Sequence, residues 1–431
     1  MPLSLRRVVI GAPIATERMA HERLPILLAL PIFAPDALSS TAYASEEIMA
    51  ALLQAGTSLF NITPLLALAI IVLLSIVVIS YRQIVMAYPS GGGSYVVAGD
   101  NLGPVPAQIA GASLLVDYIL TVAVSSSAGI AAIVSLVKGL NPSSNIGQYT
   151  VHMCLAAVLF ITLINLRGAK ESGLAFALPA YSFLVLMYGM IGYGVYQYFS
   201  GHLTPVHSAV DLQNARYLNE NTSRIAFENF GELSRFAGLF LILHAFASGC
   251  TALTGVESIA TGTQAFKEPA SRNAATTMGI LAVLLGTIFF GLSFLAVHSH
   301  ALPPNATLMS PAAIEAAHAA GREVTLGETV VSQIGRAVFG TSLLYIGMQI
   351  VTCIILILAA NTAFAGFPRL CALQAGDGFL PRQLANIGDR LVYNNGILIL
   401  AFFSALTIIL FRGDVHHLIP LYAIGVFLCF T

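Results

Sequence analysis

Long, uninterrupted apolar stretches separated by short polar connectors make up most of this chain. Stretches such as 65–79 and 281–297 show none of the polar–apolar alternation of a membrane barrel strand. Apolar stretches of about 20 residues are typical of helices that cross a bilayer, because lipid offers an exposed backbone no hydrogen-bond partner. The pattern predicts ten spans, at about 25–53, 62–88, 104–138, 150–167, 173–199, 237–266, 274–298, 334–365, 396–412 and 416–431.

Composition agrees with a chain that the lipid bilayer surrounds. Hydrophobic residues make up 57% of the sequence and charged residues 9%, against about 25% charged residues in soluble domains. So few charges could not cover the surface of a soluble protein of this size. The net charge of −1 gives no reason to expect a nucleic-acid partner. We therefore predict an all-α polytopic membrane protein.

The distribution of Lys and Arg predicts the orientation. With the N-terminus in the cytoplasm, the inner segments carry twelve of these residues and the outer segments seven, as the positive-inside rule requires. The first 24 residues lack the apolar core and cleavage site of a signal peptide. We therefore expect a multi-pass protein of the cell (inner) membrane with a cytosolic N-terminal segment, 1–24.

Two predicted spans contain helix-breaking residues at mid-membrane. Span one has Pro35 and Asp36 there, and span six has Gly249, Gly255 and Glu257. The two spans lie five apart, so they hold corresponding places in two halves of five, which is typical of transporters with inverted repeats and broken helices. We predict a first repeat at 25–199, an extracellular loop at 200–236 and a second repeat at 237–431. The last span is still apolar at Thr431, so we interpret the sequence as truncated at its C-terminal end.

Acidic residues inside predicted spans are the first candidates for chemistry. Asp36, Asp117 and Glu257 each lie deep in an apolar stretch, where an ionisable side chain costs a few kcal/mol and is usually functional. Carbonyls left free at a helix break attract cations, and a neighbouring carboxylate adds to that preference. Glu46 and Glu47 lie toward the outer end of span one, and we interpret them as residues that end the span at the interface.

Hydroxyl groups add oxygen atoms around these carboxylates. Asp117, Thr121 and Ser125 are spaced i, i+4 and i+8, so they share one face of span three. Thr254 lies beside the second break. Carboxylate, hydroxyl and carbonyl oxygens suit hard cations, and rings of carbonyl-type oxygens replace the hydration shell of potassium. A single Ser or Thr in a membrane helix more often bonds to its own backbone, so the prediction depends on the whole group.

Several stretches together resemble the amino acid–polyamine–organocation (APC) superfamily of transporters, and within it the KimA-type potassium–proton symporters. The glycine-rich segment 87–103 and the DGFLPR loop are general to the superfamily, whereas DALSSTAY and the acidic third span are more specific. The stretches that carry the resemblance are APDALSSTAYASEEI (34–48), AYPSGGGSYVVAGDNLG (87–103), LLVDYILTVAVSSSAGI (114–130), ALTGVESIATGTQAFKEPASRNAATT (252–277), AGDGFLPRQLANIGDRLVYNNGI (375–397) and LIPLYAIGVF (418–427).

The resemblance implies the LeuT/APC fold, with potassium bound between spans one, three, six and ten. It also implies a proton as coupling ion, no cofactor, and a homodimer. A further implication is regulation by a cyclic dinucleotide through a C-terminal region that the present sequence does not include. Transferred motif by motif, the implied potassium-binding residues are Asp36, Tyr43, Asp117, Tyr118, Thr121, Ser125, Thr254, Glu257 and Tyr422.

Other functions stay open at this point. Amino-acid permeases of the same fold usually carry a glycine-rich stretch at the first break, whose bare N–H groups hold the substrate carboxylate. Here that place reads APDALSS, and Asp36 would repel a carboxylate at short range by a few kcal/mol. A passive channel would not need two broken helices, and an enzyme would need a nucleophile–base pair or metal cluster that the sequence does not indicate. Proton-coupled potassium uptake is the main prediction, and an amino acid or polyamine permease is the alternative.

Overall fold

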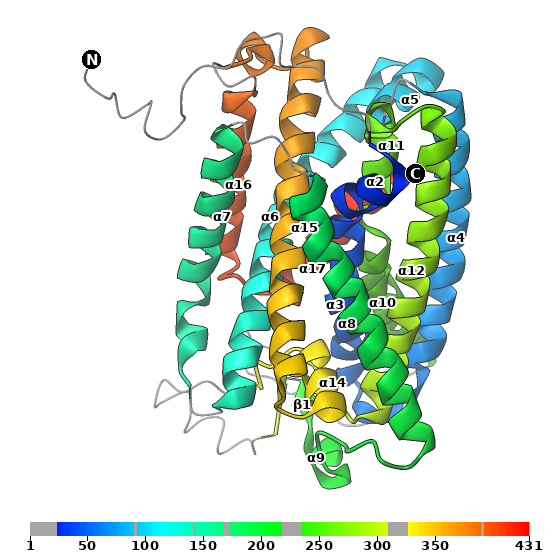
Figure 1. The fold of residues 1–431 in the computed structure, drawn as a ribbon, viewed down its shortest axis with the longest axis vertical. Coiled ribbons are helices and arrows are strands. Elements are labelled where there is room, and N and C mark those ends of the chain that lie inside the picture. The colour runs from blue at the N-terminus through cyan, green and yellow to red at the C-terminus, as the bar shows by residue number, and fades with distance from the viewer. Residues whose placement is uncertain are drawn as a thin grey trace, which may run out of the picture.

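The computed structural model describes residues 24–89, 93–141, 144–167, 173–217, 235–308, 326–388 and 392–430. Within these ranges the chain is almost entirely helical (Figure 1). Its one sheet pairs two short antiparallel strands, β1 (Arg216–Tyr217) and β2 (Ala306–Thr307). Of the predicted segments, residues 1–23 of the N-terminal segment and 218–234 of the outer loop lie outside the described residues.

Each of the ten predicted spans is helical. Seven helices are long and apolar enough to cross a membrane, and there are eight spans when the bent pair α2–α3 is counted as one. The shorter apolar helices α16 and α17 complete the set, which confirms a polytopic α-helical membrane protein. In chain order the spans are α2 (Ile26–Phe33) with α3 (Pro35–Leu53), α4 (Thr63–Ala87), α6 (Pro104–Leu140), α7 (Thr150–Leu166), α8 (Gly173–Phe199), α10 (Arg235–Gly249) with α11 (Glu257–Thr261), α12 (Ala270–His298), α15 (Leu343–Gly376), α16 (Asn394–Leu410) and α17 (Val415–Phe430).

Two short helices show that the halves are inverted copies. The helix α5 (Gly93–Leu102) follows the second span, and α14 (Val330–Phe339) follows the seventh. Each is followed by the longest helix of its half, α6 with 37 residues and α15 with 34. Figure 1 shows α5 at the top of the bundle and α14 at the bottom. The same order of elements with opposite direction is the predicted inverted repeat.

The two broken spans also run in opposite directions. Figure 1 shows α2 above α3, whereas α11 lies above α10. Backbone hydrogen bonds join the start of span one to the end of span six: the Leu24 N–H donates to the Ala265 carbonyl (2.7 Å), and the Lys267 N–H donates to the Leu24 carbonyl (2.9 Å). Both half-helices at this end of the bundle, α2 and α11, are therefore tied together.

The two breaks differ in form. Span one bends by 48° between α2 and α3, but helical hydrogen bonds persist across the bend, with the Ala34 N–H bonded to the Leu30 carbonyl and the Leu38 N–H to the Ala34 carbonyl. Pro35 is tolerated there because the first turn of α3 needs no N–H. Span six unwinds further, through the 3₁₀ turn η5 (Cys250–Leu253) and an extended Thr254. The unwinding predicted at both breaks is therefore confined in span one to a single residue.

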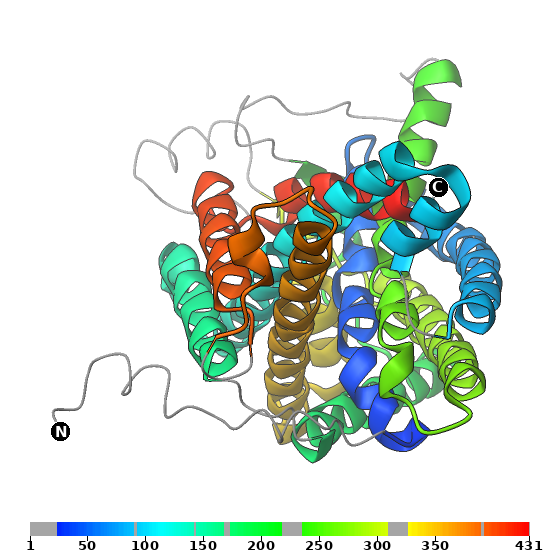
Figure 2. The ribbon, with the colours of Figure 1, turned by 90° about the horizontal axis from the view of Figure 1, so that it is seen from above.

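The bent first span runs through the centre of the molecule. Every residue of α3 is buried, and Figure 2 shows α3 between α15 on one side and α12 on the other. It contacts α10, α12 and α15. Irregular backbone at membrane depth is tolerated when other helices surround it in this way, so the breaks lie where a site can form.

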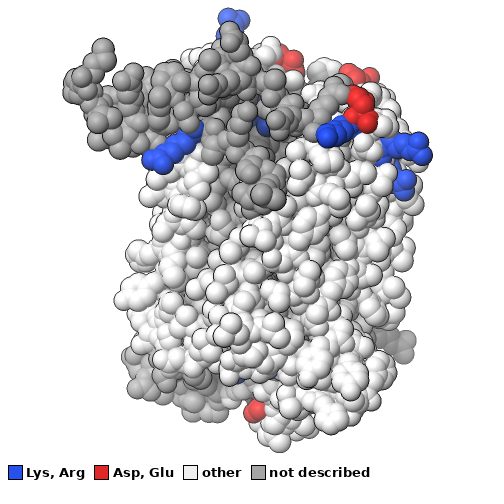
Figure 3. Space-filling model, in the orientation of Figure 1, with Lys and Arg blue, Asp and Glu red and all other residues white. Residues whose placement is uncertain are grey.

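Charge is concentrated at one end of the visible surface. Figure 3 shows a broad band without charged side chains, and Lys and Arg gathered at the upper end, where Figure 1 places α5. That end is the one that the sequence assigns to the cytoplasm. Large exposed hydrophobic side chains cover the outer helices, among them Leu65 and Ile76 on α4 and Phe402 on α16, as expected for a surface in contact with lipid.

Candidate functional site

Gly255 brings the two helix breaks into direct contact. Its backbone has φ +78°, a conformation that side chains other than glycine rarely adopt. A Cβ atom at this position would lie 2.5 Å from the Ala37 nitrogen and 2.8 Å from the Asp36 Cγ. The Ser40 hydroxyl also approaches the Ala252 carbonyl at 3.4 Å. The unwound part of span six therefore lies against the first turn of α3.

Three buried carboxylates lie around this contact, although their oxygens are not all within 4.8 Å of one another. Asp36 lies in the first turn of α3, Glu257 in the first turn of α11, and Asp117 on α6. Their exposed fractions are only 5%, 5% and 2%, and the three groups interact electrostatically. One oxygen of each is buried without a hydrogen-bond partner in the described structure: Asp36 Oδ1, Asp117 Oδ1 and Glu257 Oε2. Unpaired buried charge is strongly unfavourable, so the arrangement suits a cation or protons.

Tyrosine and threonine hydroxyls border the carboxylates. Tyr43, about two turns beyond Asp36 on α3, bonds to the side chain of Thr254. The Thr121 hydroxyl donates to the Tyr422 hydroxyl at 3.3 Å, which links α6 to α17. Tyr422 is 1% exposed and interacts with Asp36. Spans one, three, six and ten thus all contribute oxygen atoms to one region.

The remaining predicted residues lie at the edge of this region. The Tyr118 ring packs against Gly366 of α15, where an added Cβ would lie 2.5 Å from its Cζ, although Tyr118 still interacts with Glu257 and Asp117. Ser125 is buried two turns along α6 from Asp117. All nine sequence-predicted residues therefore fall in or beside one region.

Other hydroxyls of span one behave as ordinary membrane-helix residues. Ser39, Ser40 and Thr41 donate to backbone carbonyls three residues earlier in their own helix, at 2.8, 2.6 and 2.7 Å. Bonds of this kind satisfy the hydroxyl locally. These three side chains therefore have a structural reason for being polar.

One residue near the carboxylates gave no signal in the sequence. Tyr81 of α4 is 5% exposed and interacts with Glu257, Asp117 and the Ser94 side chain of α5. A tyrosine toward the end of an apolar span is common, and nothing in the sequence shows that α4 turns it toward α11. Tyr81 bounds the region on the side of α5.

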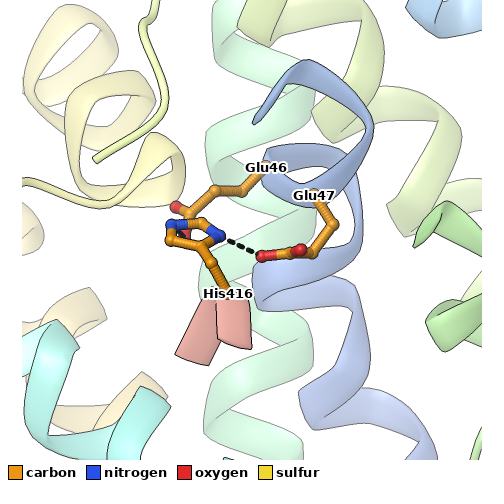
Figure 4. Close-up of side chains that lie close together, drawn as sticks. All are labelled: Glu46, Glu47 and His416. Atoms are coloured by element: carbon orange, nitrogen blue, oxygen red, sulfur yellow. Dashed lines mark hydrogen bonds and ion pairs between the residues drawn. The ribbon is translucent and has the colours of Figure 1, made fainter. Parts of the chain in front are cut away.

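A second polar cluster lies in the other half of α3 (Figure 4). Glu46 and Glu47 are 4% and 5% exposed and so are buried, unlike the interfacial residues that the sequence indicated. His416, at the start of α17, hydrogen-bonds through Nδ1 to Glu47 Oε1. Its Nε2 lies 3.8 Å from Glu46 Oε1. The Val330 N–H, at the start of α14, donates to Glu46 Oε2 at 2.8 Å.

This second cluster was not predicted. Among the described residues it is the one group of three His, Cys, Asp or Glu side chains whose ligand atoms lie within 4.8 Å of one another. The two carboxylates face different nitrogens of one imidazole, Glu47 at hydrogen-bond distance and Glu46 at 3.8 Å, so the three side chains lie in a row. That arrangement fits a shared proton better than it fits a metal ion at a common centre. The partners are 369 residues apart, and the sequence gives no hint of their pairing.

Two inverted halves whose broken helices meet around buried carboxylates have the architecture of inverted-repeat membrane transporters. Residues 36–431 match the family model described as amino acid permease, and the chain belongs to that family.

One relative with higher sequence identity agrees with this assignment. The chain is 40% identical over 429 residues, 99% of its length, to the potassium transporter KimA of Bacillus subtilis (strain 168), and it spans 63% of that protein. Among solved structures it resembles crystal structures of two mutants of the Eremococcus coleocola manganese transporter, with TM-scores of 0.46 and 0.43 and identities of 12% and 13%. Each of these alignments covers 99% of this chain and 81% of the other.

Proposed function

We propose that this protein is a secondary active transporter that takes up potassium ions together with protons. The observation that carries the proposal is the electrostatic interaction of three buried carboxylates, Asp36, Asp117 and Glu257, each with a buried oxygen that lacks a hydrogen-bond partner in the described structure. The donors around them are oxygens, which suit a hard cation. The name of the Bacillus subtilis relative supports potassium as the ion.

Neutral oxygens complete the proposed potassium site. Tyr43, Thr121, Thr254 and Tyr422 border the carboxylates, and Tyr118 and Ser125 line its edge. Rings of oxygen atoms of this kind replace the hydration shell of a potassium ion. The chain's role in the proposal is to bind and release ions, with no cofactor and no catalytic step.

Charge balance supplies the reason for proton coupling. Three ionised carboxylates around one potassium ion would leave two negative charges in a buried region, which is strongly unfavourable. Carboxylates that share a site avoid this by holding a proton on one or more of them. Potassium and protons therefore bind to the same set of side chains, and the two enter together.

Alternating access follows from the two breaks. The bend at Ala34 and the unwound stretch at Gly255 let α2 and α11 tilt separately from α3 and α10. In this fold one helical bundle rocks against the other around a fixed site, and here the two repeats would be 25–199 and 237–431. We further propose that the charged end carrying α5 faces the cytoplasm of a cell (inner) membrane. A homodimer and regulation by a cyclic dinucleotide stay predictions of the family resemblance.

The protein in proteoliposomes provides the direct test. An inward proton gradient should drive uptake of potassium or its tracer rubidium. Asp36→Asn, Asp117→Asn and Glu257→Gln should each lower uptake at least about tenfold, because a lost charge–cation contact is worth more than about 1.4 kcal/mol. Potassium at a hundred times its Kd should also stabilise the folded wild type by about 2.7 kcal/mol. The thermal unfolding midpoint should therefore rise.

The control is Asp211→Asn, which changes a carboxylate on the short helix α9 (Ala209–Asn214) outside the spans and should leave uptake unchanged. Stabilisation by an amino acid or a polyamine and not by potassium would establish an amino acid or polyamine permease instead. Full potassium uptake by both Asp36→Asn and Glu257→Gln would contradict the proposed site.

A further inference from the structure

The row formed by Glu47, His416 and Glu46 lies on the outer side of the proposed potassium site. Glu46 follows Asp36 by ten residues on α3, about 15 Å along a helix. His416 precedes Tyr422 by six residues on α17. Its side chain is 16% exposed, against 4% and 5% for the two carboxylates, so the imidazole is the member of the row that is most open to the outside.

Among the residues that the structure describes, the charged groups that face His416 are acidic. Besides Glu46 and Glu47, the Asp414 carboxylate accepts a hydrogen bond from the His416 backbone N–H at 2.9 Å. The other Asp414 oxygen bonds to His417 Nδ1 at 2.6 Å. From α14, the group that faces the row is the Val330 N–H, which holds Glu46 in place. An imidazole between carboxylates can accept a proton at one nitrogen and release one from the other.

A cavity continues from the row toward the potassium site. Both Glu46 and Tyr43 line it, together with Val415, the neighbour of His416. Its walls include the small side chains Ala42, Ala128 and Ala132, and it has room for a water molecule. Tyr43 in turn interacts with Asp36 and Glu47. Polar groups therefore follow one another from the outer end of α17 to the first helix break.

We infer that Glu47, His416 and Glu46 form the proton-entry site of the transporter and deliver protons through this cavity to Tyr43 and Asp36. A hydronium ion on the outer side gives up a proton as an N–H bond forms on the His416 imidazole, which Glu47 holds at Nδ1. The Nε2–H bond breaks as an O–H bond forms on Glu46, once the two groups close from their separation of 3.8 Å, so one proton and one positive charge enter the row. A water in the cavity then takes the proton from Glu46 and passes one on through the Tyr43 hydroxyl. The inference rests on the proposed proton-coupled uptake.

Two transport assays on the same proteoliposomes separate proton delivery from potassium binding. One measures rubidium accumulation driven by an inward proton gradient, and the other measures rubidium–rubidium exchange without a gradient. Glu46→Gln is the main variant, because Gln still accepts the Val330 hydrogen bond but takes up no proton. It should lower gradient-driven accumulation at least about tenfold, since a positioned proton-transfer group contributes about a hundredfold or more, and leave exchange within about twofold of wild type. His416→Gln should behave alike.

The matched control is His417→Gln, which makes the same change at the adjacent residue, whose side chain is 46% exposed. It should retain both activities and the wild-type dependence on external pH. Wild-type accumulation by Glu46→Gln and His416→Gln would overturn the proton-entry site and leave the proposed function standing. Equal loss of accumulation and exchange in both variants would also overturn it, in favour of a structural link between α3 and α17. A wild-type protein that shows exchange but no gradient-driven accumulation would refute the proton coupling itself.

Discussion

Gly255 lies against Asp36 with no space for a side chain between them. A Cβ on Gly255 would lie 2.8 Å from the Asp36 Cγ, and the backbone there has φ +78°. The glycine does two things at once: it allows span six to unwind, and it lets the unwound backbone touch the bend of span one. The approach of Asp36 to Glu257 depends on this contact.

Gly255→Ala should therefore lose both stability and transport. The left-handed conformation alone costs a residue with a side chain about 1–3 kcal/mol, and the Cβ would press on the Ala37 backbone as well. We expect a lower thermal unfolding midpoint and no rubidium uptake. Gly347→Ala on α15 is the control, since an added Cβ there has no atom within 4 Å. Alanine favours the helix over glycine by up to about 1 kcal/mol, so this variant should be at least as stable as the wild type. Normal uptake by Gly255→Ala would show that the breaks need not touch.

The sequence predicted that the apolar stretches are helical and that the buried carboxylates belong to a site, because both follow from the free-energy cost of placing polar groups in lipid. Lipid penalises an unsatisfied backbone and an unpaired charge, so apolar stretches must be helices, and Asp36 and Glu257 must have a partner. The form of the first break was beyond this reasoning. Pro35 predicts an interruption, but a proline in the first turn of a helix removes no hydrogen bond, and the chain only bends.

Contacts between residues that are distant in the sequence could not be predicted either. His416 pairs with Glu47 across 369 residues, and Tyr81 meets Glu257 only because α4 packs beside α11. Neither residue has a local motif. Packing between helices decides these contacts, and hydrophobic periodicity contains no information about which helices are neighbours.

The bond between Thr121 and Tyr422 should matter for ion affinity. Hydrogen bonds between membrane helices are worth about 0.6 kcal/mol on average, so Tyr422→Phe should raise the half-saturating rubidium concentration about threefold. Thr121→Val should do the same, and the double variant should be no worse than the single ones, since each removes the same bond. Tyr345→Phe is the control, because it removes a buried bond to Ser332 (2.8 Å) away from the carboxylates. Additive effects of Thr121→Val and Tyr422→Phe would show that the two hydroxyls act separately.

The buried carboxyl of Glu328, just before α14, should make the stability of the protein depend on pH. Burial raises the pKa of this carboxyl, although the Arg336 guanidinium at 2.8 Å and the Ser332 hydroxyl act in the opposite direction. The folded protein thus holds this proton more tightly than the unfolded chain does. The contribution of Glu328 to stability should therefore fall as the pH rises above the ordinary glutamate pKa of 4.5.

Glu328→Gln should flatten the fall of the thermal unfolding midpoint as the pH rises above 4.5. Asp211 provides the comparison, since hydrogen bonds from the Ser208 side chain and backbone lower its pKa, which gives the opposite slope. Asp211→Asn should therefore not flatten the profile. If the slope of the unfolding midpoint against pH is the same in Glu328→Gln as in the wild type, the effect of Arg336 on the pKa of Glu328 outweighs the effect of burial.

The orientation of the protein in the membrane determines whether His416 receives protons from outside the cell. Val210 belongs to α9, which lies at the lower end of the bundle in Figure 1, and Phe379 follows Asp377, which accepts a hydrogen bond from Tyr95 of α5 at the upper end. The two side chains are 63% and 51% exposed. Of the native cysteines, Cys154, Cys250 and Cys371 are buried and Cys353 and Cys429 are half-buried, so the wild type should show little background labelling. A membrane-impermeant maleimide should label Val210→Cys in intact cells, and Phe379→Cys only after permeabilisation. The reverse pattern would place His416 and both glutamates on the cytoplasmic side, where the same residues could only serve proton release.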